Sequence, residues 1–428
     1  MGVRLFWLAA AGAAGAAVGG AAAGAHPLIA TTGLLVAGGV AAMLVLVRPA
    51  LSVWVGVLVP AIELVLPSST WHLAGFVLLL VGAVAAWPAA SGLARRWATL
   101  FAVTAVWITF AGLVISPRGI GTTQLVIGID YALLLAMVTA LVTVKFDFIR
   151  LALAGWGVAA SWLAITTPDL IADRSQTVIG ENANGLGSLC ALGLVAAASA
   201  LAASRNRLLH WGWAVGVVCA SGIVATGSRG ALVAAVAGAG AVLLQPHLRR
   251  GGMRSVVIVG SSLLITYAAM DAGLRWFTAY VGRSSASFEN VMGREEALRF
   301  AILTGWNNPL AGVGLGRLSV VPYYNGDQGL GLRAHNTFAG IFAESGVVAL
   351  LLVLVVIGRA LTRARLDPGG LLGLVVAFVV LGFTLEWWGT ARVGVLAMFV
   401  MAAAGTSRRQ IEQPEHAATE PSPTPAGG

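Results

Sequence analysis

The segment RAHNTFAGIFAESG (residues 333–346) begins with two residues that could take part in chemistry, Arg333 and His335, and then becomes apolar. His335 can titrate near neutral pH, as a general base must. Arg333, two residues before it, carries a permanent charge that suits an anionic group. Asn336 and Thr337 can cap the helix that follows. This combination indicates either an ordinary polar rim at a membrane surface or a site that removes a proton beside a bound anion.

A stripe of small and polar residues continues down the same segment. Thr337, Gly340 and Glu344 recur at i, i+3 and i+7, so they share one face of a helix. Such a face is expected to pack inside a bundle. Glu344 would lie about 10 Å below the helix start, at about 1.5 Å per residue. It is expected either to orient the site or to tie helices together.

Two further arginines occupy positions that an anionic ligand would explain. Arg229, in TGSRG (residues 226–230), begins an apolar run, and the helix dipole opposes a cation at a helix start. From Arg294 to Trp306 a helix is predicted, which the sequence NNP (residues 307–309) ends, and its apolar residues recur at helical spacing: Ala297, Leu298, Ala301, Ile302 and Trp306. Arg294 lies four and seven residues before Leu298 and Ala301, so it is predicted to share their buried stripe. An inward arginine needs an anionic partner, and the alternative is an arginine that snorkels from an interfacial helix.

The elements that must position these residues are strongly apolar. The chain has 428 residues, is 58% hydrophobic and only 10% charged, which is too little charge to cover a soluble protein of this size. Apolar runs of about 20 residues recur along it, each long enough to cross a bilayer core. The sequence therefore predicts an all-α, polytopic transmembrane helical bundle, with one long external loop that contains short helices.

We expect 12 to 14 spans. The expected ranges are 5–24, 28–47, 50–66, 73–90, 97–115, 124–144, 149–166, 184–203, 209–226, 229–246, 254–271, 336–358, 369–387 and 390–405. The first run is mostly Ala and Gly, and a signal peptide that ends near AGAHP is the alternative to a span.

The distribution of charge orients these spans. With the N-terminus inside, most Lys and Arg fall in inner connections, as the positive-inside rule requires. This rule explains the net charge of +9 without a nucleic-acid partner, and none is expected. The acids within or beside spans then all fall in the outer half. Each alone is explained equally well by a carboxylate that snorkels to the interface, but together they favour a polar chamber open to the outside. These acids are Glu63, Asp130, Asp271, Glu344 and Glu386.

The same topology divides the chain into five parts. Residues 1–180 are expected to form N-terminal transmembrane helices, and residues 181–271 further helices with the external Arg229 motif. Residues 272–335 form the long external loop, residues 336–405 the C-terminal transmembrane helices, and residues 406–428 a disordered cytoplasmic tail.

No metal site and no cofactor are expected. Cys190 and Cys219 lie in apolar runs and are interpreted as small core residues, and no Cys/His cluster has zinc spacing. The glycines of GVGLG (residues 312–316) do not follow a strand, as a nucleotide-binding loop would. They predict a tight turn that lets backbone segments approach closely.

Four features in this order resemble the O-antigen ligase and polymerase superfamily of bacterial membrane glycosyltransferases. They are ENANGLG (residues 181–187), TGSRGAL (226–232), GREEALRFAILTGWNNPLAGVGLGR (293–317) and AHNTFAGIFAESGVVALLL (334–352). The likeness extends from Glu181 to about Gly358, roughly half the chain.

The resemblance implies metal-independent transfer of a glycan from undecaprenyl diphosphate to an acceptor, either a hydroxyl of another glycan or a lipid-linked sugar. The reaction would occur at the external face of the bacterial cytoplasmic (inner) membrane, among its lipids, during surface polysaccharide assembly. By similarity, His335 would take the proton of the acceptor hydroxyl. The substrate-binding residues would be Arg229, Arg294, Arg333, Asn336 and Glu344, with Arg333 and Arg317 as competitors of Arg294 for the diphosphate.

Other functions remain as alternatives. Ligases, polymerases and protein-glycosylating enzymes share these motifs, so the motifs do not choose among them. A secondary transporter or a lipid or polysaccharide exporter is the alternative from another class, although such proteins tend to place their sites near the midplane, often between two repeats. A structural partner in an envelope complex is the third reading.

Overall fold

The computed structural model describes residues 44–65, 70–116, 123–142, 144–167, 183–203, 209–250, 285–318, 321, 334–366, 370–385 and 391–406. Within these ranges the chain is helical and forms no strand, which confirms the all-α prediction. The helices are α3 (Ala50–Val65), α4 (Thr70–Ala86), α5 (Gly92–Phe110), the π-helical turn η1 (Ala111–Ile115), α6 (Thr123–Leu141), α7 (Phe146–Thr166), α9 (Ala183–Ala203), α10 (Leu209–Thr226), α11 (Arg229–Arg250), α13 (Ser285–Asn307), α14 (Thr337–Ala364), α15 (Leu371–Thr384) and α16 (Ala391–Thr406).

These helices carry the expected membrane spans. Four of them are long and apolar enough to cross a bilayer: Gly92–Ile115, Phe146–Thr166, Ala183–Ala202 and Thr337–Ala364. Shorter apolar stretches occupy α3, α4, α6, α10, α11, α15 and α16. The spans expected at 5–24 and 254–271, most of 28–47, and the tail lie outside the described residues. The total number of spans and the five-part division therefore stay predictions.

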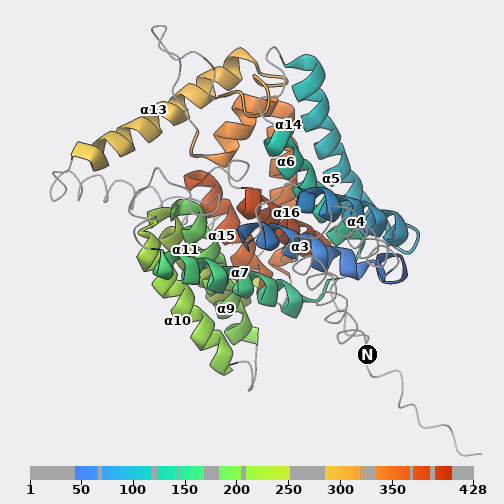
Figure 1. Cartoon of the computed structure of the whole chain (residues 1–428), viewed down its shortest axis with the longest axis vertical. Helices are drawn as coiled ribbons and strands as arrows, with labels where there is room; N and C mark the ends of the chain where they lie inside the picture. Colours follow the sequence, from blue (N-terminus) through green and yellow to red (C-terminus); the bar gives the residue numbers. More distant parts are fainter. Residues whose placement is uncertain are drawn as a thin grey trace, which may run out of the picture.

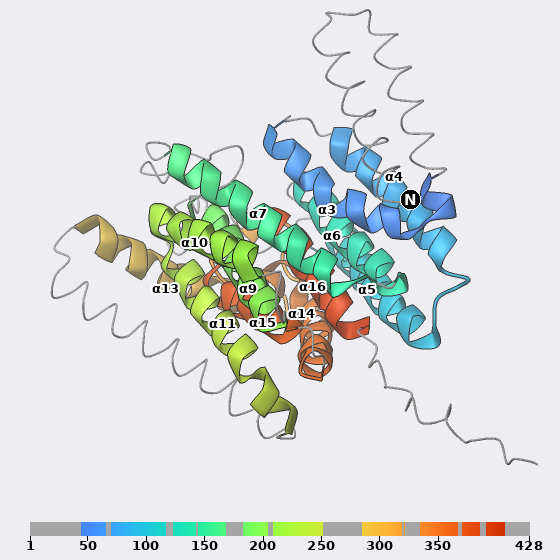
Figure 2. The same ribbon diagram turned by 90° about the horizontal axis from the view of Figure 1, so that it is seen from below.

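The bundle has two flanks and a centre (Figures 1 and 2). On one flank α7, α9, α10 and α11 pack against one another, and on the other α3, α4, α5 and α6 do so. The C-terminal helices α14, α15 and α16 lie between them, with α15 against α11 and α16 against α6. Cys190 in α9 and Cys219 in α10 are buried and form no disulfide, as predicted for core residues.

Helix α13 stands apart from this arrangement and packs on α14 (Figure 1). It ends at Asn307, before Pro309, as predicted. It begins at Ser285, however, and its 23 residues make it longer than the short helix predicted from Arg294 to Trp306. The predicted helix begins only after Gly293, so it leaves out the first two turns.

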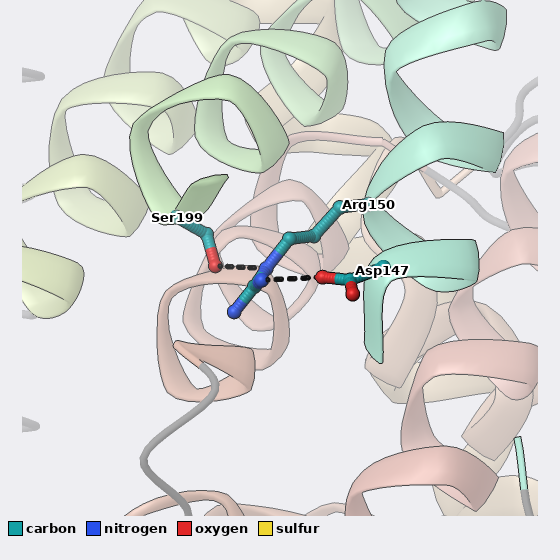
Figure 3. Close-up of polar contacts among 3 residues, drawn as sticks. All are labelled: Asp147, Arg150 and Ser199. Carbon is teal, nitrogen blue, oxygen red and sulfur yellow. Dashed lines mark hydrogen bonds and ion pairs between the residues drawn. The ribbon is translucent and has the colours of Figure 1, made fainter. Parts of the chain in front are cut away.

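A buried arginine joins three helices at their ends (Figure 3). Arg150, in the second turn of α7, is 5% exposed. Its Nε donates to Ser199 Oγ at 3.1 Å and its Nη1 to Asp147 Oδ1 at 3.0 Å. Ser199 lies four residues before the end of α9 and packs against Gly370, the residue that precedes α15. Because the charge is paired and hydrogen-bonded, it can remain buried and fix the start of α15.

Candidate functional site

The start of α14 is defined by its cap. Asn336 has an extended backbone (φ −148°, ψ 119°), and its Oδ1 accepts hydrogen bonds from the N–H groups of Phe338 and Ala339 at 3.0 and 3.1 Å. This satisfies two of the donors that a helix start leaves unpaired. The predicted cap is thus confirmed for Asn336, whereas Thr337 is the first residue of the helix.

His335 has an unusual backbone conformation. Its φ is +48°, and it is the one non-glycine residue with positive φ in the part of the chain that the structure describes. Its side chain is exposed, whereas Ala334 before it is 1% exposed. L-residues visit the left-handed region uncommonly, and such a conformation persists where the surroundings determine it. The buried Ala334 and the capping Asn336 therefore hold His335 between them with its ring outward.

The end of α15 anchors the start of α14. Thr337 is fully buried, and its hydroxyl donates to the carbonyl of Leu385 at 2.7 Å. The Asn336 amide donates to the carbonyl of Phe383 at 3.5 Å, and the rings of Phe338 and Phe383 lie 4.9 Å apart. These contacts place His335 directly beside the end of α15.

This anchor gives a testable prediction. Thr337→Val is expected to lower the free energy of unfolding by about 1–3 kcal/mol, because the buried carbonyl of Leu385 loses its donor. Thermal unfolding of the purified protein measures the effect. Thr337→Ser keeps the hydroxyl and should stay near the wild type. A Val variant as stable as the Ser variant would show that the hydrogen bond adds nothing.

Arg229 reaches the same end of α15 from another helix. It is the first residue of α11, as predicted, and its side chain is exposed. The next residue, Gly230, packs so closely that a Cβ there would lie 2.6 Å from Thr384 Oγ1. Thr384 precedes Leu385, the partner of Thr337. The starts of α11 and α14, which carry Arg229 and His335, therefore contact Thr384, the last residue of α15, and Leu385, its C-cap.

The loop before Arg229 is tied to α9. Gly227 turns the chain with φ +58°, and the buried Ser228 donates from Oγ to Asn184 Oδ1 at 3.3 Å. Asn184 belongs to ENANGLG, at the start of α9. Two of the motifs noted in the sequence are thus brought into contact, and they fix where Arg229 emerges.

Helix α14 is broken in its third turn, at Gly346 (φ +79°, ψ −179°). The carbonyls of Ala343 and Glu344, which the break leaves without their usual partners, accept from the N–H groups of Val313 and Gly314 at 2.8 and 3.0 Å. On the other side of the break, the N–H of Val347 donates to the carbonyl of Pro309 at 2.7 Å. Residues 309–314 therefore supply the backbone partners that an apolar helix must find within the protein.

Two glycines permit this close backbone approach. A Cβ on Gly346 would overlap the backbone of Leu310, and a Cβ on Gly312 would overlap the backbone of α14 between Ala343 and Ser345. Gly312 also has positive φ, as do Gly314 and Gly316. The predicted close approach of the GVGLG turn is confirmed, whereas its partner, the break in α14, was not predicted.

Glu344 lies where this turn ends. It is 5% exposed and shares the buried face of α14 with Thr337 and Gly340, as predicted. Its Oε1 accepts from the N–H of Leu318 at 3.3 Å, so the carboxylate fastens the loop to the helix. This contact joins a loop to a helix rather than one helix to another, so both roles expected for Glu344, and its part in substrate binding, stay predictions.

The prediction for Arg294 is wrong in one respect. Ala297 and Ala301 are buried against α14, but Arg294, one turn earlier on the same stripe, is exposed. Ile302 and Trp306, also predicted on the buried stripe, are 40% and 68% exposed. The burial of each position depends on where α13 meets α14, which the spacing alone does not give. Arg333 lies outside the described residues.

Within the described ranges, no group of three or more His, Cys, Asp or Glu side chains is placed to hold a metal ion. The charged groups brought to the end of α15 are instead Arg229 and His335, one fixed cation and one titratable ring.

Residues 214–354 match the family model of the O-antigen ligases. The resemblance to the O-antigen ligase superfamily is confirmed. This matched region covers about a third of the chain, from α10 through the broken part of α14, and includes Arg229, Arg294 and His335. No curated protein matches the chain in a sequence search.

Proposed function

We propose that this chain is a membrane glycosyltransferase of the O-antigen ligase or polymerase type. It transfers a glycan from undecaprenyl diphosphate to an acceptor sugar hydroxyl at the external face of the bacterial cytoplasmic membrane, during surface polysaccharide assembly. The observation that carries the proposal is the position of His335: strained, exposed, and anchored to the same end of α15 as Arg229, inside the region that matches the O-antigen ligase family.

The proposed reaction uses His335 as a general base. Its imidazole takes the proton of the acceptor hydroxyl while that oxygen attacks the anomeric carbon of the donor glycan. The bond from this carbon to the diphosphate oxygen breaks, and undecaprenyl diphosphate leaves with the electron pair. A positioned base contributes about 10²- to 10⁴-fold to such a step. The fixed backbone of His335 serves this role, because positioning the base is part of its effect.

Arg229 supplies the charge that the leaving group needs. It lies at the N-terminus of α11, where the backbone N–H groups and the helix dipole also favour an anion. An arginine alone is disfavoured there, but an arginine beside a bound diphosphate is favoured. The guanidinium can bind two phosphate oxygens at once and stays charged at every relevant pH. Arg294, exposed on α13, is proposed as the second arginine, with Arg333 as its competitor.

In vitro transfer tests this function. Purified protein given an undecaprenyl-diphosphate-linked glycan and an acceptor is expected to extend the acceptor in the presence of EDTA, because the arginines and not a metal stabilise the leaving diphosphate. Product length separates a polymerase from a ligase. Activity that EDTA removes and Mg²⁺ restores would contradict the metal-independent mechanism.

The arginine roles give a separate prediction. Arg229→Gln and Arg294→Gln are each expected to lower kcat/KM for the donor about 10- to 100-fold, since a hydrogen bond to a charged group contributes about 1.5–3 kcal/mol. Arg299→Gln is the matched control, because Arg299 is also exposed on α13 and has no proposed contact with substrate. Equal losses in all three variants would point to net charge rather than to specific contacts.

A transporter or exporter is the alternative function, and the break in α14 is the feature that it would use. In a transporter the freed carbonyls of a broken helix commonly coordinate a coupling ion. Here the carbonyls of Ala343 and Glu344 accept hydrogen bonds from the GVGLG turn. The break thus holds the loop that follows α13. This use of the freed carbonyls favours the glycosyltransferase over a transporter.

A further inference from the structure

A cavity of about 310 Å³ lies between the start of α5 and the end of α14. It is lined by Leu93, Arg96, Trp97, Arg359, Thr362 and Arg363. Arg359 lies roughly 20 residues beyond Thr337 on α14, which corresponds to about 30 Å along the helix. The cavity is therefore remote from His335 and belongs to the opposite end of the bundle.

Three guanidinium groups give this cavity a strong positive charge. Arg96, Arg359 and Arg363 are exposed, no acidic residue lines the cavity, and none of the three forms an ion pair with the described residues. Arg95, beside Arg96, differs, because its Nη2 donates to the carbonyl of Pro88 at 3.0 Å. The N-terminus of α5, capped by Ser91, adds the positive end of a helix dipole. The cavity is thus arranged for an anion that is not part of the described chain.

Apolar surface continues from the cavity along both helices. On α5, Val103 and Phe110 follow Arg96 at i+7 and i+14, and they are 48% and 47% exposed. On α14, Val355 precedes Arg359 by four residues and is 46% exposed. Arg96 and Arg359 thus lie at the ends of two helices that expose apolar side chains in the adjoining turns, and both helices are long and apolar enough to span a membrane. A ligand that fits both surfaces has an anionic head and apolar chains.

We propose that this cavity binds the phosphate of an anionic phospholipid in the leaflet at this end of the bundle. The arginine forks hold the phosphate oxygens, and the acyl chains lie along the exposed stripes of α5 and α14. A soluble phosphate presents the same oxygens, but it leaves the apolar stripes unused. The proposal does not depend on the proposed glycan transfer.

Native mass spectrometry of the purified full-length protein tests this site, with phosphatidylglycerol and phosphatidylcholine as probes. The variant that combines Arg96→Gln, Arg359→Gln and Arg363→Gln is expected to bind phosphatidylglycerol about tenfold more weakly or worse, with a smaller change for phosphatidylcholine, whose choline cation offsets the phosphate charge. Arg95→Gln removes a neighbouring charge outside the cavity and is expected to bind as the wild type does. Equal weakening by Arg95→Gln, or full binding by the combined variant, would overturn the site.

A competition experiment and a second set of variants complete the test. Inorganic phosphate added as a competitor is expected to leave bound phosphatidylglycerol in place, and efficient displacement would overturn the lipid assignment in favour of a soluble anion. If the combined Gln variant does not fold, the corresponding three Arg→Lys changes keep the charge and remove the fork. If this combined Lys variant binds phosphatidylglycerol more weakly than Arg95→Lys does, the site is supported. If the two variants bind phosphatidylglycerol equally, the site is overturned.

Discussion

Replacing His335 with alanine is expected to abolish glycan transfer while the protein still accumulates in the membrane. The proposed base is lost, and a positioned general base contributes about 10²- to 10⁴-fold to the rate. The exposed ring makes little contribution to packing, so the fold should survive. The rate of transfer from the lipid-diphosphate glycan, with purified wild type and variant compared at equal concentration, measures the effect.

The positive φ of His335 requires a second variant beside alanine. Alanine in the left-handed region carries a strain of about 1–2 kcal/mol, whereas asparagine tolerates this conformation. His335→Asn therefore removes the base but keeps the backbone, and it should be as inactive as His335→Ala. Activity restored by asparagine would mean that the backbone, not the imidazole, is what transfer requires. His210→Ala, at the far end of α10 from Thr226, is the matched histidine control and should remain active.

Gly346→Ala is expected to destabilise the protein by about 3 kcal/mol or more and to eliminate activity. Its backbone (φ +79°, ψ −179°) lies in a region that essentially only glycine occupies. The new Cβ would also overlap the backbone of Leu310, which cannot move without breaking the hydrogen bonds of residues 309–314 to α14. Thermal unfolding in detergent, followed by the transfer assay, measures both losses.

Gly358 provides the matched control in the same helix. A Cβ there would meet no atom within 4 Å, and its backbone shows no positive φ. Gly358→Ala is therefore expected to be neutral or to stabilise α14 by up to about 1 kcal/mol. If Gly346→Ala were tolerated as well as Gly358→Ala, the docking of the loop into the break would not be what holds this part of the fold.

The helices were predictable because their signal is local. A continuous apolar run must bury or satisfy its backbone, and a helix does so within the run, so α3 to α7, α9 to α11 and α14 to α16 appear where hydropathy places them. The cap at Asn336 and the end of α13 before Pro309 are equally local. The break at Gly346 is different, because VVALLL after ESG gives the pattern of an uninterrupted helix.

The missed features of the site are contacts between distant segments. The hydrogen bond from Thr337 to Leu385 and the contact of Gly230 with Thr384 join helices that no periodicity pairs. The exposure of Arg294 depends on how far α13 overlaps α14, which spacing within α13 does not determine. One signal did exist: three glycines after Asn-Asn-Pro and a glycine after Glu-Ser mark the two backbones that approach each other.

Glycan transfer by this protein is tested by following both products of one reaction. Purified protein is given an undecaprenyl-diphosphate-linked glycan and an acceptor, and released undecaprenyl diphosphate and extended acceptor are quantified together. Equal amounts of the two products are expected from the wild type, and neither product is expected from His335→Asn. Donor that stays intact, or that crosses the bilayer with its diphosphate linkage unbroken, would contradict glycan transfer and favour the exporter.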